Sequence, residues 1–139
     1  MAKSITLTKS QMDNIKDIDV NGAAIKDIII EYSQHFISIP VIKPFPKPVV
    51  GILLFQGVVY SEISSHEPFG EGCYILNFDV KVDIPGDNIY FNINNVEDLN
   101  ALIKNNSCFK ATIELNSGDR ISIIANQLLY SMEESEEII

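Results

Sequence analysis

The sequence predicts an α+β domain: a mostly antiparallel sheet of five or six strands, with an N-terminal amphipathic helix and a second helix near 95–104 packed on one face. Three observations lead to this class. Residues 73–84 alternate between apolar and mostly polar side chains, 109–125 alternate in the same way, and 22–36 have helical spacing. A chain of 139 residues has the usual size of one domain, so we expect a single domain over 1–139.

The stretch 73–84 is the clearest strand. One face would carry the apolar residues Tyr74, Leu76, Phe78, Val80, Val82 and Ile84. Successive side chains of a strand point to opposite faces, so the residues between them, including Asp79 and Asp83, would face solvent. A turn at 85–87 and a second alternating stretch at 89–93 predict a hairpin partner for this strand.

Residues 1–38 are predicted to be a largely helical N-terminal part. The first segment has two interpretations, a short strand around Ile5 and Leu7 or a short helix through Met12 and Ile15. After a turn at 19–22, apolar residues recur with the spacing of one helix face over 22–36, at Ile25, Ile28, Ile29, Tyr32 and Phe36.

Residues 39–48 hold four prolines, which exclude a helix and a central strand. We therefore expect an extended, rigid connector, which we prefer to a ligand for a proline-binding module. The sheet with its inserted helix would occupy 49–132. Its first part, 49–63, is either one strand with a bulge at Gly57 or two short strands, and 64–72 is a loop.

Later elements follow the same logic. Asn94 and Asn95 precede Glu97 and Asp98, a pattern typical of a helix start, so a helix is expected to about residue 104. Residues 109–115 and 121–125 would form a hairpin around a turn at 116–119. Residues 128–132 are either a final strand or a last helical turn, and 133–139 form an acidic tail.

Charge is the main functional signal. The net charge is −9; residues 1–47 sum to +1, with six Lys and five acids, and residues 48–139 sum to −10, with four bases and fourteen acids. A protein surface with this excess of negative charge repels nucleic-acid phosphates and anionic membranes and favours a basic protein partner. The predicted partner-binding residues are Glu62, Glu67, Glu71, Asp79, Asp83 and Asp87.

We therefore expect a non-catalytic acidic protein that inhibits a basic partner by occlusion, such as a toxin-immunity protein or a phage-encoded inhibitor. General solubility is the equal alternative explanation of the charge. Two other functions stay open: a structural subunit of a larger assembly that pairs through an exposed edge strand, and a small enzyme or ligand-binding protein with a pocket near the 64–72 loop.

No motif predicts a catalytic residue, a cofactor or a metal. Residues 17–22 resemble the opening of a calcium loop, but Ile28 stands where the closing carboxylate would be needed. His66 and Glu67 lack a nucleophile at a recognisable spacing. Cys73 and Cys108 are expected to be free thiols. There is no apolar run long enough to span a bilayer and no secretory signal at the N-terminus, so a cytoplasmic location is expected.

Overall fold

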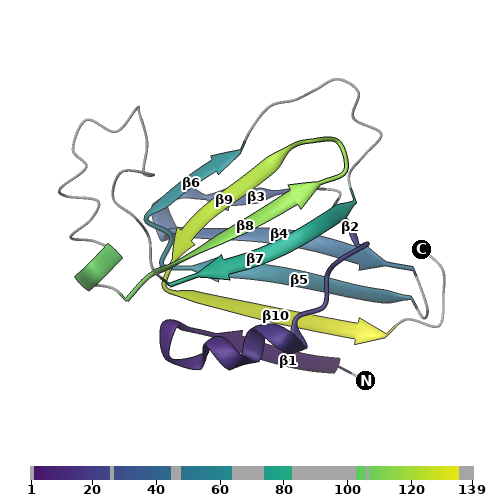
Figure 1. The fold of residues 1–139 in the computed structure, drawn as a ribbon, viewed down its shortest axis with the longest axis horizontal. Helices are drawn as coiled ribbons and strands as arrows, with labels where there is room; N and C mark the ends of the chain where they lie inside the picture. The colour runs from purple at the N-terminus through teal and green to yellow at the C-terminus, as the bar shows by residue number, and fades with distance from the viewer. Residues whose placement is uncertain are drawn as a thin grey trace.

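The computed structural model describes residues 2–25, 27–44, 48–63, 74–82, 103–105 and 107–134. These residues form two antiparallel sheets packed face to face (Figure 1). The predicted α+β class is therefore wrong, because the described residues are mostly β-sheet and no pair of helices among them covers a sheet. The described helical residues are the two 3₁₀ helices η1 (Lys9–Asp17) and η2 (Tyr32–Gln34) and the three residues 103–105.

Sheet A has the strand order β1–β10–β5–β4–β2, and β3 pairs with the same edge of β4 as β2 does. Its strands are β1 (Ala2–Leu7), β10 (Gln127–Glu134), β5 (Val49–Gln56), β4 (Phe36–Lys43), β2 (Ala24–Ile25) and β3 (Ile29–Glu31). Sheet B has the order β6–β9–β8–β7, with β6 (Tyr60–Ile63), β9 (Arg120–Ala125), β8 (Phe109–Leu115) and β7 (Ile75–Lys81).

The helix predicted over 22–36 is wrong. That stretch forms β2, β3 and η2, and His35 ends η2 with a left-handed φ of 57°. The isoleucines at 28–30 fit a helix face by their spacing, but β-branched side chains also suit strands, and backbone pairing with β4 decides between the two. Both interpretations of the first segment, a strand and a helix, are present in the structure: β1 contains Ile5 and Leu7, and η1 follows it.

The connector predicted over residues 39–48 starts later than predicted. Residues 39–43 belong to β4, which pairs with β5 over its whole length, so the exclusion of a central strand is wrong at Pro40. On the other edge of β4, β3 pairs with 36–38 and β2 with 41–42, so no described residue pairs with Ile39 or Pro40 there. This interruption suits proline, which has no N–H to donate to a neighbouring strand.

A register shift changes which side chains of β7 face the core. Ile75 pairs with Leu115 and Asn77 with Glu114, so Leu76 has no partner of its own. Ile75 is consequently buried, whereas Leu76 is 63% exposed, the reverse of the predicted alternation. Beyond the shift, Phe78 and Val80 pack against the core as predicted. In the described sheet β7 is terminal and pairs with β8; residues 83–102, with the predicted partner strand and most of the second helix, lie outside the described residues.

Two bends carry the chain from one sheet to the other. The segment 49–63 is two strands in different sheets, with Gly57 at a φ of 62° between them, and Asn126 separates β9 from β10. At this corner the Asn126 N–H donates to the Gln56 carbonyl and the Val59 N–H to the Ile124 carbonyl. The bent pairs β5–β6 and β10–β9 therefore run side by side through both sheets, as the corners of sandwiches commonly require.

The core lies between the inner faces of the two sheets. Sheet A contributes rows of residues that pair directly across neighbouring strands, such as Ile39, Leu53 and Tyr130. Sheet B contributes Ile113 and Ile121, and the segment at 18–25 adds further apolar side chains. The predicted hairpin at 109–125 is confirmed as β8–β9, and residues 128–132 are strand.

Candidate functional site

Two of the six predicted partner-binding residues, Glu62 and Asp79, lie on described strands. The register links them across sheet B: Glu62 pairs with Ser122, Ser122 with Thr112, and Thr112 with Asp79. Directly paired residues point to the same face, so both carboxylates belong to one row on the outer face. They stand at opposite edges, three strand spacings or about 14 Å apart.

The charges on this outer face are balanced in its described part. The neighbouring rows place three acids and three bases on it: Glu62, Asp79 and Glu114 against Lys81, Lys110 and Arg120. The Arg120 guanidinium lies 3.9 Å from the Glu114 carboxylate, and the Tyr60 hydroxyl donates to Glu62 at 3.0 Å. The strands of sheet B therefore do not by themselves form an acidic surface.

The excess negative charge lies elsewhere in the sequence. Glu67, Glu71, Asp83 and Asp87 fall outside the described residues. They belong to 64–73 and 83–102, which flank β7 in the sequence and together contain six acids and no Lys or Arg. The described residues hold eleven acids and eight bases, a net of −3, so these two segments account for −6 of the total −9.

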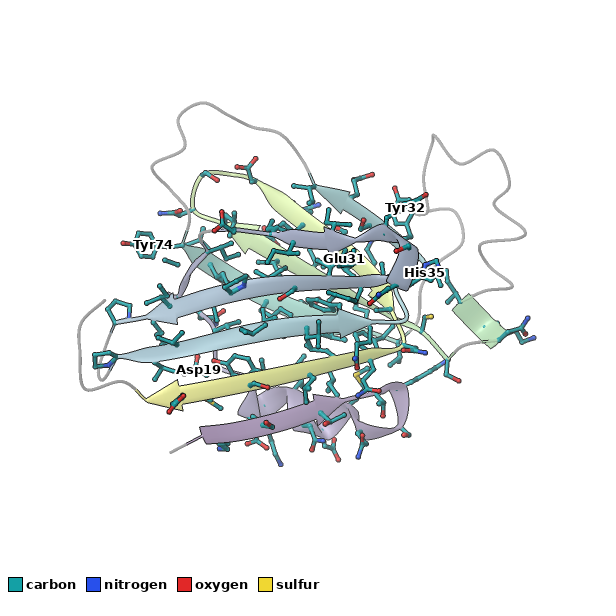
Figure 2. The ribbon with its side chains drawn as sticks, turned by 180° about the vertical axis from the view of Figure 1, so that it is seen from behind. Asp19, Glu31, Tyr32, His35 and Tyr74 are labelled. Atoms are coloured by element: carbon teal, nitrogen blue, oxygen red, sulfur yellow. The ribbon has the colours of Figure 1, made fainter. Side chains whose placement is uncertain are left out.

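A pocket of about 600 Å³ opens at the corner between the sheets. Its walls come from β3, η2, the first residues of β4 and the bend between β5 and β6, and Figure 2 shows Glu31, Tyr32 and His35 on its sheet A side. The lining residues are Ile30, Glu31, Tyr32, His35, Phe36, Ile37, Gly57, Val58, Val59, Tyr60, Ser61 and Asn126.

Sequence reasoning placed a possible pocket near the 64–72 loop, and this one is lined by Ser61, shortly before that segment. The sequence prediction missed the wall formed by residues 30–37, because it assigned residues 22–36 to a helix. The apolar character of Ile30 and Val58 was visible in the sequence, but their proximity depends on the bend at Gly57. His66, the other loop candidate, lies outside the described residues.

The calcium-like segment has a structural role. The Asp19 carboxylate contacts the Lys43 ammonium at 2.7 Å, and the Gly22 N–H donates to the carbonyl of Ile75, which ties the turn to sheet B. Within the described part of the chain, no three His, Cys, Asp or Glu side chains gather closely enough to hold a metal ion.

The Cys108 thiol is buried and lies with Ile124, under the partly buried side chains of Val59, Tyr60 and Ile103. Burial raises the pKa of this thiol above its ordinary value, and the nearby Lys9 charge opposes the rise only in part. The thiolate, which is the reactive form, is therefore disfavoured here.

No protein-family model matches the sequence, and no curated protein matches it. None of the helices in the described ranges is long and apolar enough to cross a membrane.

Proposed function

We propose that this chain is a non-catalytic binding protein that occludes the working surface of a basic protein partner. The observation that supports this proposal is the uneven distribution of charge. Acids dispersed for solubility would be spread along the chain, whereas the two segments that flank β7 in the sequence carry two thirds of the net charge, −6 of −9, without one Lys or Arg. A local concentration of like charges disfavours folding slightly and speeds the encounter with a partner of opposite charge.

The proposed contact surface is the outer face of sheet B together with the acidic segments. Glu62 and Asp79 mark its two edges on the strands, and Glu67, Glu71, Asp83 and Asp87 supply most of the charge. Long-range attraction steers the partner, and exposed apolar side chains such as Leu76 and Tyr74 at the start of β7 give short-range contact. A cationic toxin or a nucleic-acid-handling protein would present a surface of the opposite charge.

The test compares two variants of equal charge change. The first neutralises the acidic segments, and the control neutralises four exposed acids elsewhere: E67Q/E71Q/D83N/D87N against D13N/D17N/D27N/E133Q. Partners are captured from native host lysate on the immobilised chain, eluted with salt and identified, and the association rate is then measured for each variant.

The first variant should associate about 10-fold more slowly and lose most of its salt dependence, because steering depends on the local field. The control variant should behave like the natural chain. Equal losses in both variants would mean that only net charge matters, and unchanged rates in both would refute the proposal.

The corner pocket favours a second candidate function, the binding of a small apolar ligand. The probe is anilinonaphthalene sulfonate, whose fluorescence rises on an apolar surface. Ile30, half exposed at the pocket, is replaced in I30D, and Leu76 on sheet B is replaced in the control L76D. Loss of fluorescence in I30D alone supports the pocket, and equal fluorescence in both variants contradicts it.

A further inference from the structure

The outer face of sheet A, which faces the viewer in Figure 2, is apolar. The inner side chains of its strands are the buried ones, such as Leu53 and Phe55, so the residues between them point outward. The register aligns these outward residues in rows across β3, β4, β5 and β10. We call this surface the sheet A face; its apolar residues are Ile29, Phe36, Pro40, Ile42, Val50, Ile52, Leu54 and Leu129.

Charges are confined to the ends of the sheet A face. One central row joins Ile29, Ser38, Leu54, Leu129 and Thr6, and the next joins Pro40, Ile52, Ser131 and Ser4. Neither row contains a charged residue. Glu31 and Glu133 stand in the two outermost rows. A face exposed to water for solubility alone would carry Lys or Glu at such positions, as the outer face of sheet B does.

No described element lies over the sheet A face (Figure 2). Ile52, near its centre, is 43% exposed, and Ile29, at its edge, is 48% exposed. We propose that a second copy of this chain packs on the sheet A face, so that two sandwiches meet sheet to sheet in a symmetric dimer. This inference goes beyond the proposed function, since it uses the side of the molecule opposite sheet B.

The size of the face matches this occupant. Strands β4, β5 and β10 have eight residues each and β1 has six. At about 3.4 Å per residue and about 4.8 Å between strands, these four strands cover about 500 Å². Two copies would therefore bury about 1,000 Å² of flat area, which is the lower limit for a specific interface. Obligate and symmetric interfaces are also the most apolar ones.

A second copy fits this face better than the basic partner does. The central rows contain no carboxylate that could attract a cationic surface. Two copies can meet there without placing like charges opposite each other and without burying an unpaired charge. A two-fold axis makes the same patch serve both partners, and aligned sheet packing at about 10 Å is a common arrangement of two such faces.

The experiment is sedimentation velocity of the full chain from about 1 to about 200 μM. The natural chain should sediment as a dimer, twice its mass of 15.5 kDa, at the upper concentrations. I52K places like charges near the two-fold axis and should weaken the dimer at least about 10-fold. I52T, which keeps a β-branched side chain, should weaken it less, and L76K, on sheet B, should leave it unchanged.

Circular dichroism and a urea titration confirm that each variant folds. A natural chain that stays monomeric at the highest concentration overturns the inference, and so does a dimer that L76K disrupts and I52K does not. Salt separates this inference from the proposed function: raising it from about 50 to about 300 mM should preserve or strengthen an apolar dimer of two acidic chains and weaken the complex with a basic partner.

Discussion

The contact between Gly51 and Tyr130 gives a sharp test of how sheet A packs. Gly51 lies on the inner face of β5, and a methyl group built on it would stand 2.8 Å from Cε1 of Tyr130 and 3.1 Å from the Ser131 carbonyl oxygen. Tyr130 is 2% exposed, so its ring has little room to move away. The glycine therefore makes room for the aromatic ring.

The expected cost of G51A follows from two opposing terms. Overpacking against a buried ring costs about 1–3 kcal/mol. Replacing a strand glycine lowers the entropy of the unfolded chain and returns about 0.5–1 kcal/mol. The net destabilisation should lie between about 0 and about 2.5 kcal/mol, centred near about 1 kcal/mol. Urea unfolding measures such a change, because a domain of this size has a slope of about 1–3 kcal/mol per molar urea.

The decisive comparison repeats G51A in a Y130L background. Removing the ring removes the contact at 2.8 Å, while the contact with Ser131 stays, so G51A should cost at least about 1 kcal/mol less there. A coupling energy below about 0.5 kcal/mol would refute the reasoning, because Gly51 would then not be reserved for Tyr130.

Two further predictions use the same unfolding assay. I75A should destabilise the protein by about 2–5 kcal/mol and L76A by less than about 1 kcal/mol, because the register shift buries Ile75 and exposes Leu76. The opposite order would contradict the register shift and support the alternation predicted from the sequence. Burial raises the pKa of the Cys108 thiol above its ordinary value, and burial together with the negative charge of Asp19 raises the pKa of the Tyr130 hydroxyl above its ordinary value. The unfolded chain therefore releases these protons first, so stability should fall as the pH rises beyond about 9, and a midpoint constant up to pH 10.5 would contradict this.

Local patterns predicted the parts of the fold that local interactions determine. The hairpin at 109–125 needs only two alternating stretches and a turn, and Gly118, with a φ of 94°, supplies the conformation of that turn. The same alternation misplaced Ile75 and Leu76, because a register shift depends on β8, more than thirty residues away in the sequence. Pro40 is likewise tolerated in β4 through a break between β2 and β3 that no local pattern shows.

The sequence of β5 contains a signal of the two-sheet architecture that the predicted α+β class did not use. In β5, apolar residues occupy both parities, Leu53 and Phe55 inward and Ile52 and Leu54 outward. A continuous apolar run indicates a strand covered on both faces. Reading it this way would have pointed to the sheet A face. The candidate partner site could be predicted only in part. The sequence gives the charges of 64–73 and 83–102, and the described strands give the positions of Glu62 and Asp79 alone.

The two proposed interactions constrain each other. Sheet A and sheet B present opposite sides of the sandwich, so a dimer through the sheet A face leaves both sheet B sides open (Figure 1). Each dimer would carry a charge of −18, twice −9, and would bind two basic partners, a stoichiometry of two to two. The I52K variant should then bind its partner one to one with the same affinity per chain. If I52K weakened partner binding as well, the partner would contact both copies, and the sheet A face would belong to the binding site.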